Sequence, residues 1–158
     1  MIVDTSQCTD TLLMVRPYHF RFNEQTAVNN YYVEESSGAP DDEIYQQAEA
    51  EFDNFVDVLR GKGVNVMVIQ DNAEPDTPDA VFPNNWISLH SDGRVGLYPM
   101  YAPNRRWERR EDIVDLLKDN FRVESVVDFT DYELKEQFLE ATGSISYSIL
   151  TVKHHATR

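Results

Sequence analysis

The sequence of 158 residues predicts a single-domain α/β protein built from repeated ββαβ units. Short apolar, β-branched runs alternate along the chain with segments whose apolar residues follow a helical period. Residues 64–71 also align with residues 121–128, at an offset of 57 residues, and each copy lies between a predicted helix and a loop with an acidic residue. A period of this size indicates radial or stacked repeats, although two unrelated helix–strand units would show the same match.

The first predicted strand covers residues 11–15 and ends at Arg16-Pro17, because proline cannot extend a ladder. A long polar loop follows, from residue 18 to about residue 40. Asp41 and Asp42 then begin a helix whose apolar residues recur at spacings of three and four. The apolar face of this helix, which ends at Gly61 and Gly63, consists of Ile44, Ala48, Phe52, Phe55, Val56 and Leu59.

The second half of the chain repeats this alternation. Residues 64–69 are apolar and β-branched enough for a buried strand, and residues 86–89 and 94–98 flank a Ser-Asp-Gly turn that suits a hairpin. A second helix is predicted from near Arg106 to Asp119, and residues 122–127 form the next strand. The inward residues of this helix are Ile113, Leu116 and Leu117.

The composition excludes several kinds of partner. The chain has 28 acidic and 14 basic residues and a net charge of −14, whereas nucleic-acid binding requires a basic surface. No apolar run approaches the roughly twenty residues that span a bilayer, and the N-terminus has no signal-peptide pattern. Cys8 is the single cysteine, and no cluster of ligands suggests a metal site. We therefore expect a cytoplasmic protein with no cofactor, metal, membrane or nucleic-acid partner.

The segment from Pro78 to Trp86, which reads Pro-Asp-Ala-Val-Phe-Pro-Asn-Asn-Trp, is the most informative part of the chain. Asp79 follows a predicted strand, and a carboxylate there can accept two parallel hydrogen bonds from a guanidinium group. Asn84 and Asn85 add amides that could bind the same ligand. All three residue types are also common in turns, which is the more frequent explanation for an isolated aspartate.

Two further positions add to this polar set. One of Arg105 and Arg106 could hold an α-carboxylate, whereas Arg109 and Arg110 suit surface ion pairs. Glu140 precedes a run of small residues that lets a ligand approach closely, so it could orient a base or bind substrate N–H groups. A helix-terminal glutamate is the alternative. Together these side chains suit a guanidino or ureido amino acid.

The candidates for a catalytic nucleophile are poor. Cys8 lies in a polar stretch with no adjacent histidine. His19 could face a pocket from the long loop, His90 ends a strand of the hairpin, and His154 and His155 are among the last five residues. No Cys–His pair is evident from the sequence.

Taken together, these segments resemble the guanidino-group-modifying family with the pentein fold. That family includes arginine deiminases, amidinotransferases and dimethylarginine dimethylaminohydrolases, and the nearest branch is that of bacterial citrulline-utilisation hydrolases and amidinotransferase-like proteins. The resemblance extends from Leu13 to Ser144. The segments that support it are residues 14–17, 20–30, 78–86, 98–106 and 138–144.

The resemblance implies an incomplete pentein αβ-propeller, with about half of the five-bladed fold. By resemblance, Asp79 binds the guanidino or ureido nitrogens, and Asn84 and Asn85 occupy positions that are acidic in some relatives. Arg105 looks like the arginine that holds the α-carboxylate, and Glu140 looks like the acid of a Cys-His-acid catalytic set. The cysteine and histidine of that set come from a later half of full-length relatives, so we expect no turnover from this chain alone.

Residues 145–158 form a divergent tail, and Ala141 stands where the family usually has glycine. We therefore expect a truncated or frameshifted gene, or a chain that ends here by design. An incomplete propeller would expose strand edges and apolar surface, which predicts a homodimer or larger assembly. The alternatives to an amidinotransferase or guanidino-group hydrolase relative are a non-catalytic ligand-binding or oligomerisation module and a remnant without a ligand.

Overall fold

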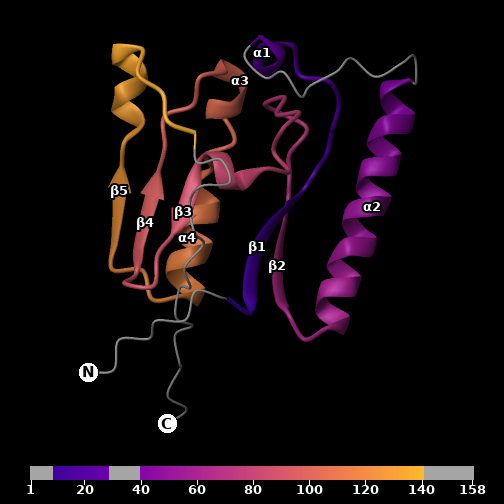
Figure 1. The fold of residues 1–158 in the computed structure, drawn as a ribbon, viewed down its shortest axis with the longest axis horizontal. Coiled ribbons are helices and arrows are strands. Elements are labelled where there is room, and N and C mark those ends of the chain that lie inside the picture. The colour runs from indigo at the N-terminus through magenta and orange to yellow at the C-terminus, as the bar shows by residue number, and fades with distance from the viewer. Residues whose placement is uncertain (1–8, 29–39, 141–158) are drawn as a thin grey trace.

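The computed structural model describes residues 9–28 and 40–140. A two-stranded parallel sheet pairs β1 (Thr11–Arg16) with β2 (Asn65–Gln70). Helix α2 (Asp41–Gly61) lies between these strands in the chain and packs beside them (Figure 1). The predicted first strand and first helix are therefore confirmed.

A second sheet contains three strands in the order β3, β4, β5. Strands β3 (Ile87–Leu89) and β4 (Arg94–Leu97) form the predicted hairpin, and β5 (Ser125–Asp128) pairs with β4 in parallel. Helix α4 (Glu111–Asn120) lies between β4 and β5 in the chain. The α/β class is thus confirmed, and β3, β4, α4 and β5 follow one another in the order of one ββαβ unit. A propeller made of such repeats stays a prediction.

Four short helical segments occupy the connections that follow the parallel strands. In Figure 1, β1, β2, β4 and β5 all run toward the same end of the molecule, where α1 and α3 lie. In α/β proteins the connections after the carboxyl ends of parallel strands commonly form the binding site. The four segments are α1 (Glu24–Ala27), η1 (Pro83–Asn85), α3 (Pro103–Arg106) and η2 (Thr130–Lys135).

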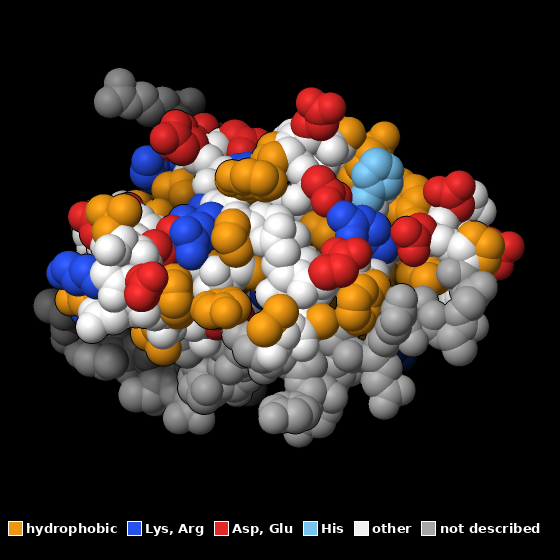
Figure 2. Space-filling model, turned by 90° about the horizontal axis from the view of Figure 1, so that it is seen from above, with side chains coloured by type: hydrophobic (Ala, Val, Ile, Leu, Met, Phe, Trp, Pro, Cys, Tyr) orange, Lys and Arg blue, Asp and Glu red, His pale blue; other side chains and the backbone are white. Residues whose placement is uncertain are grey.

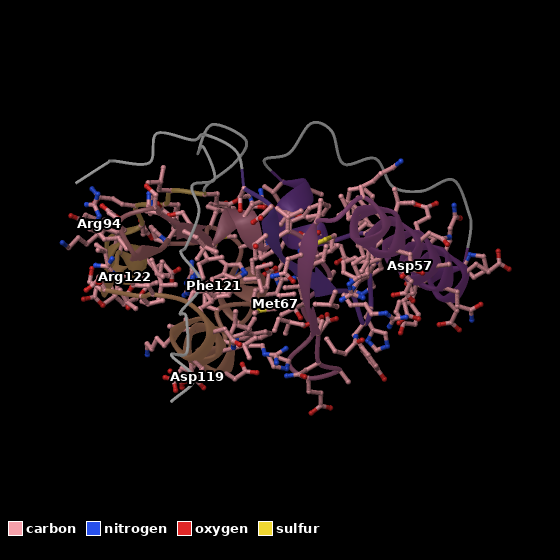
Figure 3. The ribbon with its side chains drawn as sticks, turned by 90° about the horizontal axis from the view of Figure 1, so that it is seen from below. Asp57, Met67, Arg94, Asp119, Phe121 and Arg122 are labelled. Carbon is pink, nitrogen blue, oxygen red and sulfur yellow. The ribbon has the colours of Figure 1, made fainter. Side chains whose placement is uncertain are left out.

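The core consists of two apolar clusters. The larger one joins α4 to the three-stranded sheet through Trp86, Val95, Met100 and Leu117, all with at most 1% of their surface exposed. Burial of each large side chain of this kind contributes about 1.5–3 kcal/mol. Figure 3, from below, shows Met67 of β2 near Phe121, in the middle of the molecule, so the two sheets share this cluster. The smaller cluster is Phe52, Val56 and Val66.

The predicted helix from near Arg106 to Asp119 is confirmed from Glu111 onward as α4, with Ile113 and Leu117 buried, but its predicted start is wrong, because α3 ends at Arg106 and the chain is not helical from there to Arg110. Arg110 adopts an extended conformation, with φ −86° and ψ 132°, and begins α4. The backbone before it turns so that Glu108 points inward, where its carboxylate meets Arg105. A buried ion pair therefore outweighs the helical propensity of this segment.

Phe55 was expected on the inward face of α2, but 54% of its surface is exposed. The helix covers one narrow sheet, and Phe52 and Val56 fill that contact. Phe55 instead lines an apolar cavity of about 250 Å³, together with residues such as Leu13, Met67 and Phe121. Within residues 9–28 and 40–140, no helix has the length and apolar character needed to cross a bilayer.

Candidate functional site

Asp79 lies in the connection that follows β2, with 16% of its side chain exposed. Its Oδ2 atom accepts a hydrogen bond from Asn23 Nδ2 at 2.7 Å and one from the Thr26 hydroxyl at 3.1 Å. Arg105 Nε lies 3.9 Å from the same oxygen. All of these contacts converge on Oδ2, whereas no described residue donates a hydrogen bond to Oδ1.

The amide of Asn23 is oriented by its own partners. Its Oδ1 accepts hydrogen bonds from the backbone N–H of Gln25 at 3.1 Å and from Asn104 Nδ2 at 2.9 Å. Because the backbone N–H of Gln25 can only donate, this atom must be the amide oxygen, and the NH₂ group must face Asp79. Asn23 is 2% exposed and also caps α1, so this orientation is part of the buried structure.

Arg105 connects the Asp79 segment to α3. Its Nε and Nη2 atoms donate to the two carboxylate oxygens of Glu108 at 2.8 and 3.0 Å, in a bidentate pair. Nη2 also reaches the backbone oxygens of Asp79 and Phe82, at 3.3 and 3.2 Å. The side chains of Arg105 and Glu108 are only 5% and 1% exposed. Among the described residues, Nη1 of Arg105 has no hydrogen-bond partner.

Burial raises the pKa of the Glu108 carboxyl to about 7, against the opposing effect of Arg105. The neighbouring negative charges of Asp79 and Asp71 act in the same direction as burial. Burial also acts to lower the pKa of the Arg105 guanidinium, but the hydrogen bonds and charge of Glu108 outweigh it and raise that pKa. Arg105 is therefore a fixed positive charge inside the site.

A second buried acid, Asp71, holds the start of the Asp79 segment through Thr77. The Thr77 hydroxyl lies 3.0 and 3.1 Å from the two oxygens of the Asp71 carboxylate, and both residues are buried. Burial raises the pKa of Asp71. This contact and the carbonyl contacts of Arg105 hold the segment at both ends.

Glu140 follows η2 and lies against the segment that precedes α3. Its carboxylate accepts a hydrogen bond from the backbone N–H of Tyr101 at 3.2 Å. Its negative charge is near enough to contribute to the raised pKa of Arg105. The structure therefore brings Asp79 and Arg105 into contact and places Glu140 at the same end of the molecule. Figure 2 shows that end from above, where Asp and Glu side chains lie beside Lys and Arg.

The two asparagines of the Asp79 segment lie on η1. Asn85 is 8% exposed, and its backbone N–H donates to Phe82 at 3.1 Å. Asn84 lines the apolar cavity between the sheets. Neither side chain has a hydrogen bond to the Asp79 carboxylate among the described contacts.

Of the arginines that follow α3, Arg110 makes an ion pair with Asp112 as predicted, whereas Arg109 differs from the sequence prediction. Arg106 of α3 is more exposed than Arg105, at 31%, and its guanidinium lies 5.7 Å from the ring centre of Phe138. Arg109 was expected at the surface, but its side chain is 15% exposed and makes a bidentate pair with Glu133. Glu133 also accepts the backbone N–H of Met100 at 2.8 Å, which fixes η2 against the strand end.

Four residues that contact Asp79 or Arg105, directly or through one another, were not predicted from the sequence. Asn23 and Thr26 fall inside the segment 20–30 that supports the family resemblance, but they gave no separate chemical signal. Asn104 and Glu108 flank Arg105, and the i,i+3 spacing of Arg105 and Glu108 was available as a sign of an ion pair. Asparagines in loops are too common to be singled out without the fold.

The histidines that the structure describes lie in other contacts. The His19 ring packs against the rings of Tyr18 and Tyr45. His90 Nε2 lies 2.8 Å from the Ser88 hydroxyl. Within the described ranges, no group of three His, Cys, Asp or Glu side chains could hold a metal ion. Several positions discussed from the sequence fall outside the described residues, namely Cys8, Ala141, His154, His155 and the predicted tail of residues 145–158.

A family model described as N,N dimethylarginine dimethylhydrolase, eukaryotic, matches residues 16–148. The matched range contains Asp79, Arg105 and Glu140, together with Asn23 and Glu108. No curated protein and no solved structure matches the chain. The match confirms the resemblance to guanidino-group-modifying proteins, whereas the nearer relation to bacterial citrulline hydrolases stays a prediction.

Proposed function

The chain belongs to the N,N-dimethylarginine dimethylhydrolase family, and we propose that it binds a guanidino or ureido amino acid at the cluster of Asp79, Arg105 and Glu140. One observation supports this most strongly. In the Asp79–Arg105 contact, one acceptor atom and one donor atom have no partner among the described residues, namely Asp79 Oδ1 and Arg105 Nη1. An amino acid with a cationic end and a carboxylate end offers a partner for each.

The charges of the cluster suit such a ligand. Asp79 supplies a negative charge for a guanidinium, and the guanidinium of Arg105 supplies a positive charge for an α-carboxylate. Both charged side chains are largely buried, and a hydrogen bond to a charged group contributes about 1.5–3 kcal/mol. Arg106 is the more exposed of the two arginines, and its Nε and Nη2 atoms donate to the backbone oxygens of Met100 and Tyr101, so Nη1 is its atom that could reach the carboxylate.

Glu140 is proposed as the acid of the family's catalytic set. It lies beside the Tyr101 backbone and contributes to the electrostatic field at Arg105. Asn84 and Asn85 are proposed as ligand-facing amides only if η1 shifts, because η1 places Asn84 at the apolar cavity and buries Asn85.

The proposed function is binding without turnover, rather than hydrolysis, and the cysteine content favours it. The family chemistry requires a thiolate, and Cys8 is the single cysteine of the sequence. With no other thiol, the residues from 9 to 158 contain an acid, an arginine and amides for binding but no sulfur nucleophile. We therefore propose that this chain alone captures its ligand and does not hydrolyse it.

The test is calorimetric titration of the protein with arginine, dimethylarginine and citrulline, paired with an assay for released amine, ammonia or urea. We expect saturable binding of at least one ligand, loss of that binding in Asp79→Ala, and no release of product. Asp57→Ala is the matched control, because Asp57 is exposed on α2 at the edge of the molecule (Figure 3). Binding that survives Asp79→Ala would contradict the proposal.

A further inference from the structure

Asp79 offers its two oxygens to different partners. Oδ2 is held by Asn23 Nδ2 at 2.7 Å and lies 3.1 Å from the Thr26 hydroxyl, and Arg105 Nε approaches the same atom at 3.9 Å. In every described polar contact of the Asp79 side chain, a donor group therefore faces the Oδ2 atom. The other oxygen, Oδ1, is the acceptor that remains for a ligand.

The Asn23 amide cannot exchange the positions of its oxygen and its NH₂ group without losing other hydrogen bonds. Turning the Asn23 amide around would bring its NH₂ group against the backbone N–H of Gln25, which can only donate, and would require the Asn104 amide to turn as well. It would also leave the Asp79 carboxylate facing an oxygen. With Asn23 only 2% exposed, water does not compensate for these losses.

Thr26 reinforces this orientation. Its single hydroxyl proton lies within reach of both Asp79 Oδ2 and the backbone oxygen of Asn23, each at 3.1 Å. Both groups are acceptors, so the hydroxyl acts as a donor toward this side of the site. Asn23 and Thr26 belong to the same turn, which begins α1.

We propose that Asn23 and Thr26 are positioning residues that fix Asp79 by Oδ2, so that Asp79 recognises its ligand through Oδ1 alone and thereby selects an N–H donor. This inference rests on the proposed function. The sequence suggests that both oxygens of Asp79 accept parallel hydrogen bonds from a guanidinium. The structure instead leaves only Oδ1 for the ligand. A guanidinium donates a charge-assisted N–H hydrogen bond to this oxygen, whereas the neutral N–H groups of a ureido group donate a weaker one.

The arrangement predicts an unusual result for Asp79→Asn. The donors at the Oδ2 position will bind the oxygen of the new amide, so its NH₂ group will take the place of Oδ1 and face the ligand. The site will then offer a donor in place of an acceptor. Affinity for arginine and dimethylarginine should fall about 10- to 100-fold. Affinity for citrulline, whose ureido oxygen accepts a hydrogen bond, should stay the same or increase.

The reciprocal exchange provides the matched second variant. In Asn23→Asp combined with Asp79→Asn, position 23 keeps an oxygen for Gln25 and Asn104 but presents an acceptor to position 79. The amide at position 79 should then turn its NH₂ group toward position 23 and its oxygen toward the ligand. We expect the preference for guanidino over ureido ligands to return. Asp76→Asn, an exposed aspartate of the same connection, is the control and should leave the preference unchanged.

Titration calorimetry of the wild type and these variants with arginine and citrulline decides the proposal. Inversion of the preference in Asp79→Asn and its return in the exchange variant would support it. An equal loss of both affinities in Asp79→Asn would overturn it, because the amide would then be free to rotate.

A measurement without ligand separates this inference from the proposed function. Scalar coupling across the hydrogen bond between Asn23 Nδ2 and the carboxyl carbon of Asp79, measured by NMR, reports the contact directly. If the wild type bound none of the ligands, the proposed function would fail. Coupling would still support the fixed orientation of Asp79, and its absence would overturn that orientation.

Discussion

Single residues at the carboxyl ends of the strands hold this site together, and the Arg105–Glu108 pair connects α3 to the backbone of the Asp79 segment. The pair is buried, bidentate and linked to the backbone of the Asp79 segment. A buried ion pair is not strongly stabilising in itself, because desolvation offsets the attraction between its charges. Loss of one partner is costly, however, since the other charge then remains buried without compensation.

At a pH above about 7, where the Glu108 carboxyl is ionised, Glu108→Ala should lower the free energy of unfolding by about 3–5 kcal/mol, because it leaves the guanidinium of Arg105 buried and unpaired. Chemical denaturation monitored by tryptophan fluorescence measures this loss. Glu51→Ala, at an exposed position of α2, should change stability by less than about 0.5 kcal/mol. Equal effects of the two substitutions would show that the pair has no special role.

The raised pKa of Glu108 also predicts a dependence of stability on pH. The folded carboxyl keeps its proton up to pH about 7, whereas the ordinary value of 4.5 applies to the unfolded chain. The stabilising contribution of this group is therefore complete below pH about 4.5 and is lost as the pH rises to about 7. The free energy of unfolding of the wild type should therefore fall by about 3 kcal/mol across this pH range, relative to that of Glu108→Gln, whose side chain cannot titrate. A constant difference between the two proteins would contradict the raised pKa.

At the scale of elements, the helices and strands predicted correctly are those in which the local sequence pattern and the packing favour the same structure. Helix α2 begins at Asp41 and ends at Gly61 as expected, because its acidic first turn and its glycine stop match its apolar period. The helix before β5 was predicted as one piece, since nothing local shows that Glu108 turns inward. The 3₁₀ segment η2 was also missed, because its position depends on the contact of Glu133 with Arg109 and Met100.

The hairpin turn between β3 and β4 gives a test at this scale. Gly93 has φ +86°, and an added Cβ would lie 2.7 Å from Glu124 Cγ and 3.0 Å from the backbone oxygen of Arg122. Gly93→Ala should therefore lower the thermal midpoint, with a loss of about 1 kcal/mol or more.

Gly61→Ala is the matched control for this substitution. Nothing lies within 4 Å of a Cβ added at Gly61, which sits at the end of α2. Alanine should raise stability there by about 0.5–1 kcal/mol. The same sign of change at both glycines would argue against the turn conformation of Gly93.

At the scale of the whole molecule, the predicted site depends on segments that are distant in the sequence. Asn23, Asp79, Arg105 and Glu140 follow four different parallel strands, and the common direction of these strands brings them to one end. The sequence identified three of these four residues through the family resemblance. It did not predict which atoms of Asp79 and Arg105 remain for a ligand, because that depends on the packing of α1 and α3.

The apolar surface supports the prediction of self-association. Among the strands that the structure describes, β5 is at the edge of its sheet, and large side chains nearby are exposed, including Val126, Leu134 and Leu139. We predict that light scattering at micromolar concentration gives at least twice the chain mass of 18.3 kDa. Val126→Lys should shift this assembly toward the monomer without unfolding it. A monomeric wild type would contradict this prediction.

A crystal structure of the protein with arginine bound tests the central claim most directly. The account predicts that a guanidino nitrogen lies about 3 Å from Asp79 Oδ1, while Asn23 keeps its contact with Oδ2. The ligand carboxylate should face Arg105 or Arg106. Arginine bound away from this cluster, or bound through Oδ2 with Asn23 displaced, would contradict it.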